Sequence, residues 1–193
     1  MVDSSNEGRP GFIMLDLGTG DSWRRLTQDP SVLRVQQDLP SYMSRPRYYN
    51  ELGMPIGYQQ EGLDGIQLTP DGSRVYYSPL TSNYLYSIPS VNLRARDSDP
   101  LAELAAHSNI SHHGQRGANA NGFEGDSNGL IYQLMPTENG VYYYAPADLQ
   151  THGLVEDPRI IWPDSASIGF DGYFYMNINQ VRSYYSDCFQ VSC

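Results

Sequence analysis

The sequence contains no lysine, only two cysteines and no long apolar run, and each absence excludes a class of function. Without lysine, the chain offers no residue for a Schiff base or for the lysine of a phosphate-binding loop. All 12 basic residues are arginines, against 22 acidic residues. Because the net charge is −10 and no basic run occurs, we expect no nucleic-acid partner and no membrane partner.

The two cysteines, Cys188 and Cys193, lie near the end of the chain, where a disulfide would not hold the fold together, so their pairing stays open.

No apolar stretch of about 18 residues predicts a membrane span, and residues 1–5 do not resemble a signal peptide. The motifs of nucleophilic elbows, zinc proteases, paired Cys-x-x-Cys sites and phosphate loops are absent. Nothing supports a nucleophilic triad, and we expect no cofactor and no bound metal.

Tyrosine and turn-forming residues are abundant, with 16 tyrosines, 18 glycines and 13 prolines. Residues 64–89 predict a three-stranded antiparallel meander. An alternating apolar run ends at Pro70-Asp71-Gly72, a β-branched and aromatic run follows, and a second turn leads to a third run. We interpret the tyrosines of these runs as packing residues of strands rather than as an aromatic ligand cage.

The pattern of this meander occurs three times. In each copy a leading Asp or Asn is followed, seven residues later, by the residue before a turn glycine. The leading residues are Asp64, Asn121 and Asp164, and the residues before the glycines are Asp71, Asn128 and Asp171. Four-stranded repeats with a period of roughly 40–50 residues are typical of a β-propeller. Asp-Gly and Asn-Gly turns also occur in a sandwich, the alternative fold, but the shared register favours the propeller.

The length of the chain predicts only part of such a ring. A six-bladed propeller needs roughly 270 residues, whereas 193 residues suffice for about three to four blades. We therefore predict an all-β fold with a partial propeller at residues 11–180, a disordered N-terminus at residues 1–10 and an irregular tail at residues 181–193. An open propeller has unpaired strand edges, so we interpret the chain as a fragment, with self-association through these edges as the alternative.

Two long connections and one helix interrupt the predicted strands. Residues 28–62 form a connection of a length that is usually functional or poorly ordered. Asp99 is predicted to be the N-cap of a short helix, with Pro100 in its first turn. Residues 107–120 are predicted to form a second loop. It carries His112-His113, which we interpret as a solvated pair, because adjacent residues on a strand would point apart and could not share a metal.

The leading residues of the repeats are the first candidates for function. Asp64, Asn121 and Asp164 should lie at equivalent places on the innermost strands and line a central channel. Two carboxylates and an amide oxygen suit a hard cation such as Ca²⁺, or the ammonium group of an amine. The competing interpretation is that these side chains satisfy local backbone donors in Asx-turns. Arg116 is a further candidate, either pairing with a channel carboxylate, binding an anion or forming a structural ion pair.

Several stretches, in this order along the chain, resemble the yellow and major royal jelly protein family. They are residues 11–16, 22–24, 64–82, 114–117 and 172–179. The resemblance implies a secreted six-bladed propeller, of which this chain is the middle and later part. The N-terminal blades of the family are absent, and residues 183–188 do not look like its closing strand. The sequon Asn109-Ile110-Ser111 becomes relevant if the protein is secreted.

The resemblance also implies a function. Amine-binding members of this family hold their ligand in the channel with side chains from the later blades, and the matching positions lie near Asp164 and Asn179. We therefore expect an extracellular protein that binds a small cationic or aromatic molecule.

Two enzymatic alternatives remain open. Some yellow proteins are dopachrome-converting tautomerases, for which Asp64 and Asp164 would move the proton. The other alternative is a metal-dependent lactonase of the related gluconolactonase propellers. Those enzymes hold their metal with Glu, Asn and Asp, and no matching Glu is found here.

Overall fold

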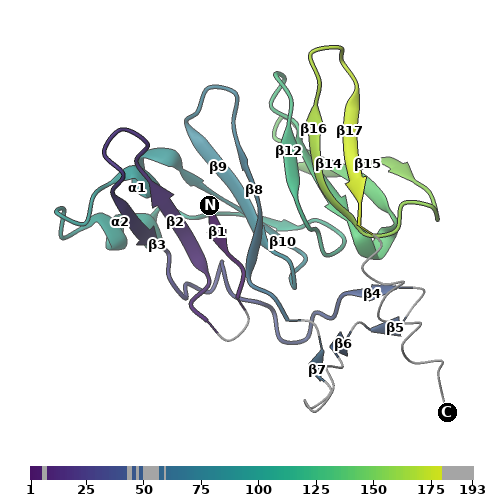
Figure 1. Ribbon diagram of the computed structural model, residues 1–193, viewed down its shortest axis with the longest axis horizontal. Helices are drawn as coiled ribbons and strands as arrows, with labels where there is room; N and C mark the ends of the chain where they lie inside the picture. Colours follow the sequence, from purple (N-terminus) through teal and green to yellow (C-terminus); the bar gives the residue numbers. More distant parts are fainter. Residues whose placement is uncertain (6–7, 43–44, 47, 50–56, 59, 180–193) are drawn as a thin grey trace.

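The computed structural model describes residues 1–5, 8–42, 45–46, 48–49, 57–58 and 60–179. Within these ranges most of the regular structure is antiparallel β-sheet (Figure 1). The N-terminal sheet consists of β1 (Val2–Asp3), β2 (Gly11–Leu15) and β3 (Ser22–Arg25). Two-residue strands follow in the long connection: β4 (Ser41–Tyr42) pairs with β5 (Arg45–Pro46), and β6 (Tyr48–Tyr49) with β7 (Gly57–Tyr58).

Two four-stranded sheets form the centre of the molecule. The first, here called blade A, consists of β8 (Leu63–Leu68), β9 (Arg74–Pro79), β10 (Tyr84–Pro89) and β11 (Ser111–Gln115). The second, blade B, consists of β12 (Phe123–Gly125), β13 (Ile131–Met135), β14 (Gly140–Ala145) and β15 (Gln150–Glu156). Hairpin C consists of β16 (Pro163–Ile168) and β17 (Phe174–Ile178).

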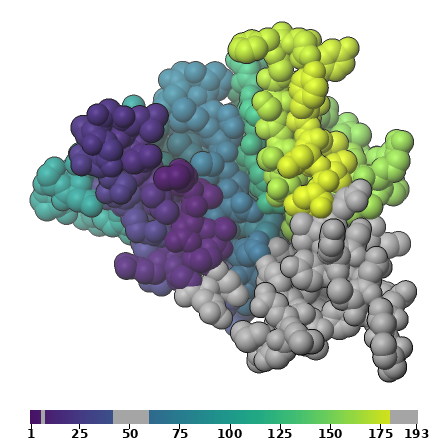
Figure 2. Space-filling model, viewed as in Figure 1, coloured from purple at the N-terminus to yellow at the C-terminus, as the bar shows by residue number. Residues whose placement is uncertain are grey.

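The first strands of these sheets lie side by side. β1 contacts β8, β8 contacts β12, and β12 contacts β16. The sheets therefore follow one another in chain order, from the purple N-terminal sheet to the yellow hairpin C (Figures 1 and 2). Successive antiparallel meanders that meet along their innermost strands are the arrangement of propeller blades. The predicted all-β propeller fold is confirmed.

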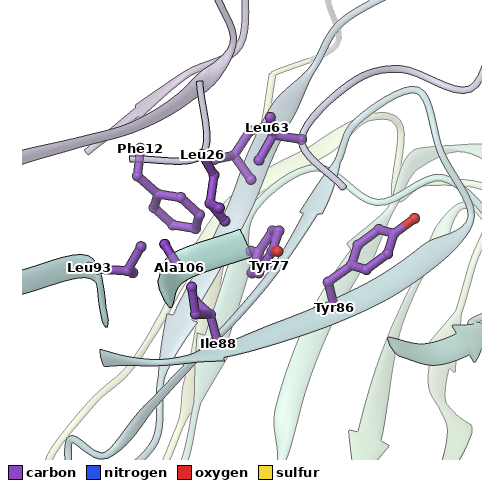
Figure 3. Close-up of a cluster of buried hydrophobic side chains, with 9 residues drawn as sticks. Phe12, Leu26, Leu63, Tyr77, Tyr86, Ile88, Leu93 and Ala106 are labelled. Atoms are coloured by element: carbon purple, nitrogen blue, oxygen red, sulfur yellow. The ribbon is translucent and has the colours of Figure 1, made fainter. Parts of the chain in front are cut away.

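The hydrophobic core lies in two layers between neighbouring sheets. One layer packs Phe12 of the N-terminal sheet against Tyr77 and Ile88 of blade A (Figure 3). The other packs Tyr76 and Leu85 of blade A, among others, against blade B. Because successive strand residues point to opposite faces, Tyr77 and Tyr76 contribute to different layers. Burial on both faces explains why the strands of blade A read as continuous aromatic and apolar runs rather than as a strict alternation.

The three turns predicted at the glycines are present. Gly72, Gly129 and Gly172 have φ values of +70°, +83° and +81°, a region that favours glycine. In the first turn Asp71 Oδ1 accepts a hydrogen bond from the backbone N–H of Ser73, at 3.0 Å, and Asp171 accepts one from Tyr173 in the same way, at 3.1 Å. The shared seven-residue spacing thus reflects an inner strand followed by the same type of turn.

The glycines after the leading residues serve a different purpose. A Cβ atom on Gly65 would come within 2.6 Å of the carbonyl oxygen of Asn121, and one on Gly122 within 2.3 Å of that of Asp164. Gly122 also donates its N–H to the carbonyl oxygen of Asp164, at 2.9 Å. Glycine therefore follows the leading residue where the next inner strand approaches too closely for a side chain.

Local predictions differ from the structure at the N-terminus, at residues 111–115 and at the start of the helix. Val2 and Asp3, expected to be disordered, form β1, because Val2 and Asp3 pair with Phe12 and Gly11 of β2. Residues 111–115, expected in a loop, form the outer strand β11, which pairs with β10. This edge strand is largely exposed, so it lacks the apolar alternation that predicts a strand.

The helix α2 (Ala102–Ser108) begins later than predicted, and its N-cap is Leu101. Asp99 caps the preceding turn instead, since its Oδ1 accepts the N–H of Leu101 at 2.9 Å. Two further short helices, α1 (Ser90–Arg94) and the 3₁₀ helix η1 (Pro136–Glu138), were not predicted. The predicted tail at residues 181–193 lies outside the described residues, and the boundaries of the predicted domain stay a prediction.

The close approach at Gly122 leads to a stability prediction. Gly122→Ala should lower the free energy of unfolding by about 1–3 kcal/mol, because the new methyl group overlaps a backbone oxygen that cannot rotate away. Gly153→Ala is the matched control, since its Cβ would meet no atom closer than 3.6 Å. Urea denaturation of both variants measures the difference, and equal midpoints would contradict this account of the repeated glycine.

Candidate functional site

The structure brings the three leading residues to one end of the inner strands. Asp64 and Asp164 are the second residues of β8 and β16, and Asn121 lies two residues before β12. Asn121 is only 6% exposed, and its Nδ2 donates a hydrogen bond to Asp164 Oδ1 at 2.5 Å. This bond joins residues of neighbouring sheets. The Asx-turn interpretation therefore does not describe Asn121, whose side chain serves a partner 43 residues away.

Asp64 has the most strongly perturbed carboxyl group of this cluster. Its pKa is raised from the ordinary 3.8 to about 7, chiefly by burial and in addition by the negative charges of Glu61 and Asp164. The positive charge of Arg116 opposes the shift. At neutral pH, Asp64 is therefore divided between its protonated and ionised forms. A carboxyl group in this state can both accept and donate a proton.

Arg116 is 3% exposed, and its positive charge interacts with the carboxyl group of Asp64. Its guanidinium donates hydrogen bonds to the carbonyl oxygens of Ala118, at 3.0 Å, and Ser82, at 2.7 Å. Burial lowers its pKa to about 9, while Asp38 and Asp64 act in the opposite direction. The predicted site residue is thus anchored to backbone carbonyls, and it acts on Asp64 through its charge.

Two further polar groups near Arg116 were missed by the sequence reasoning. Asn119 is 4% exposed, and its Nδ2, like Arg116 Nη1 and Asp38 Oδ2, is buried without a hydrogen-bond partner among the described residues. Asn119 lies two residues before Asn121 in the sequence. This proximity is the one signal from which Asn119 could have been predicted. Asp38 comes from the long connection, and nothing in its local sequence relates it to Arg116.

Asn179, predicted from the family resemblance, follows the end of β17. Its backbone N–H donates to the carbonyl oxygen of Trp162 at 3.2 Å, so it lies at the same end of hairpin C as Asp164. Its side chain is exposed. The backbone hydrogen bond thus places Asn179 near the cluster. The side-chain hydrogen bond within the cluster joins Asn121 and Asp164.

The histidine pair points in two directions, as expected for adjacent residues of a strand. The ring of His112 lies against Tyr86, with centroids 5.0 Å apart, whereas His113 bonds to Ser87 and Tyr144. His113 is therefore a partly buried contact between blades A and B and not part of a solvated pair.

In the described part of the chain, no group of three or more His, Cys, Asp or Glu residues is arranged to hold a metal ion.

Comparison with known proteins places the chain in a family. The sequence model of the major royal jelly proteins matches residues 1–164. The chain belongs to the major royal jelly protein family. No protein with a curated description matches it by sequence. Among the described residues of this family member, no helix has the length and apolar character needed to span a bilayer.

Three solved structures with similar backbones are bacterial proteins. A gluconolactonase from Xanthomonas campestris is 17% identical over 67% of this chain and 40% of its own, with a TM-score of 0.43. A virginiamycin B lyase from Staphylococcus aureus is 12% identical over 93% of this chain and 53% of its own, with a TM-score of 0.47. A calcium-binding regucalcin from Agrobacterium tumefaciens is 12% identical over 98% of this chain and 72% of its own, with a TM-score of 0.44.

The family member thus spans 40% of the gluconolactonase and 53% of the lyase. At these identities and TM-scores, the similarity carries no argument about activity.

The raised pKa of Asp64 predicts how stability depends on pH. Because the pKa is about 7 in the folded chain and 3.8 ordinarily, ionisation opposes folding. The protonated form of Asp64 therefore contributes to the free energy of unfolding. This contribution is complete below about pH 4 and is lost as the pH rises through 7. Asp64→Asn should therefore gain stability over the wild type between pH 4 and pH 8, by at most roughly 4 kcal/mol at 1.36 kcal/mol per pKa unit.

Denaturant unfolding at a series of pH values measures this gain. Asp71→Asn serves as the control, because hydrogen bonds lower the pKa of Asp71 to about 2, so its protonation does not change between pH 4 and pH 8. If the two variants showed the same pH dependence, Asp64 would have an ordinary pKa.

Proposed function

We propose that this chain is the ligand-binding part of a major royal jelly protein propeller, and that it holds a small cationic or aromatic molecule beside Asp64, Asn121 and Asp164. The hydrogen bond between Asn121 and Asp164 carries the proposal. It fixes the carboxylate of Asp164 through Oδ1, and Oδ2, which accepts no hydrogen bond from the described residues, remains available to a ligand. A carboxylate held in this way suits an ammonium group, which supplies several N–H donors.

The charges around the site favour a cation over an anion. Glu61 and Asp164 each interact electrostatically with Asp64, whereas the one arginine of the cluster is buried and bonded to backbone carbonyls. A bound cation would stabilise the ionised form of Asp64 and would lower its pKa. The preference for an aromatic ligand rests on the family resemblance.

An extracellular location is part of this proposal. Asn109 of the sequon is exposed at the end of α2, where an oligosaccharide could be attached without disturbing either core layer. A mass decrease on enzymatic removal of N-glycans, from protein secreted by eukaryotic cells, would support this location, and an unmodified secreted chain would remove the sequon as support.

Titration with tyramine, an aromatic amine, tests ligand binding. Isothermal titration calorimetry should show that the wild-type chain binds tyramine. Asp164→Asn should weaken this affinity at least about tenfold, as expected for the loss of a charge-assisted hydrogen bond. Asp171→Asn removes a charge at the far turn of the same hairpin, and an asparagine there can still accept the N–H of Tyr173. Equal affinities for the two variants, or no binding at millimolar concentrations, would refute the proposal.

A second candidate function is a dopachrome-converting tautomerase, and the pKa of Asp64 is the observation that favours it. General acid–base groups are most effective when their pKa lies near the working pH, and that of Asp64 is about 7. Tautomerisation moves a proton within the substrate and requires no redox partner, so one such carboxyl group can serve it.

Asp64→Asn should reduce the initial rate of dopachrome conversion by about a hundredfold, the low end for general acid–base catalysis. Absorbance measurements over pH 5 to 9 provide the test, with Asp171→Asn as the control. A wild-type rate equal to that of the uncatalysed reaction, alongside saturable tyramine binding, would leave the chain as a binding protein only.

A further inference from the structure

A groove of about 380 Å³ lies between the turns of blade A and blade B. The turn between β8 and β9 forms one wall, and the turns that follow β12 and β14 form the other. Figure 1 shows that the turns after β8 and β12 lie at the same end of these two strands. The groove is therefore at the opposite end of the inner strands from Asp64, and it shares no residue with the site described above.

Arg74 supplies a fixed positive charge in this groove. Its Nε donates a hydrogen bond to Ser87 Oγ at 3.0 Å, and its Nη2 donates one to Ser111 Oγ at 2.6 Å. Both partners are neutral hydroxyl groups, and within the described chain Arg74 forms no ion pair. The guanidinium is thus oriented by two bonds while its charge and its Nη1 remain available to a ligand.

Asp71 supplies a fixed negative charge in the same groove. Its Oδ1 accepts hydrogen bonds from Thr69 Oγ1, at 2.7 Å, and from both the backbone N–H and the hydroxyl of Ser73, at 3.0 and 2.8 Å. These bonds keep the carboxylate ionised and hold it in one orientation. Its Oδ2 has no partner among the described residues and remains available to an N–H donor.

The rest of the groove is suited to an apolar body. Tyr76, which is 5% exposed, contributes its aromatic ring from blade A, and Leu130, Pro146 and Ala147 contribute apolar groups from blade B. The ring of Tyr76 is held in place by Tyr144, with centroids 5.8 Å apart. Charged groups of both signs beside an aromatic surface match a small molecule that itself carries both charges.

We propose that this groove is a second ligand site, which binds a small zwitterion with an aromatic or apolar side chain, such as a free amino acid. The carboxylate of the ligand would bind Arg74, its ammonium group would bind Asp71, and its side chain would lie against Tyr76 and the apolar wall of blade B. A simple anion is disfavoured, because Asp71 would repel it, and a simple cation is disfavoured because Arg74 would repel it.

L-Phenylalanine is the probe for this site, and two analogues test the requirement for both charges. Phenethylamine lacks the carboxylate and 3-phenylpropionate lacks the ammonium group. In titrations followed by amide NMR spectra of the full chain, phenylalanine should shift the signals of residues 69–76 and 127–130. Measured at these signals, each analogue should bind the groove at least about tenfold more weakly, as expected for the loss of one charged hydrogen bond.

Variants separate this site from the one at Asp164. Arg74→Gln and Asp71→Asn should each weaken phenylalanine binding at least about tenfold, Arg74→Lys should retain part of it, and Asp164→Asn should leave it unchanged. Asp71→Asn keeps an acceptor oxygen for the turn and therefore provides the test if Arg74→Gln fails to fold. The proposal is overturned if phenylalanine shifts none of the groove signals, if either analogue shifts them with the same affinity, or if only Asp164→Asn weakens binding at these signals.

Discussion

The backbone contact between neighbouring inner strands is the constraint on which the rest of the structure depends. Gly122 donates its N–H to the carbonyl oxygen of Asp164 at 2.9 Å, and Gly65 lies so close to Asn121 that only a hydrogen atom fits between them. This contact brings the sheets together along their inner edges. The side chains farther out on β9, β10, β13 and β14 can then meet in the two core layers, which bury both faces of blade A.

The same contact determines the electrostatics of the candidate site. Residues that precede the glycines are carried to one end of adjacent strands, so Asn121 meets Asp164 and both lie near Asp64. Burial of the Asp64 carboxyl group, together with the negative charges of its neighbours, costs free energy when the group ionises, which appears as its raised pKa. A fold stabilised by apolar layers can tolerate this cost, and unfavourable groups of this kind are often found at functional sites.

The two ends of the blades thus present different chemistry. At the start of the inner strands, carboxyl groups outnumber the one buried arginine, which favours a cation. At the turn end, Arg74 and Asp71 are each oriented by hydroxyl groups, and neither is paired with an opposite charge in the described chain. These turns are built by the same repeated spacing that builds the inner strands, so one repeat unit supplies residues to both ends.

The sequence by itself determined the strands of the repeated meanders, the turns at Gly72, Gly129 and Gly172, and the equivalence of Asp64, Asn121 and Asp164. These features follow from local spacing and from backbone conformations that favour glycine. The sequence did not predict β1 or β11, since a two-residue strand and an exposed edge strand carry no apolar pattern. Only the tertiary structure decided that Asn121 bonds to Asp164, that Asp38 acts on Arg116 and that His113 joins two blades. These contacts connect residues far apart in the chain, and their strength depends on burial, which exists only once the sheets have packed.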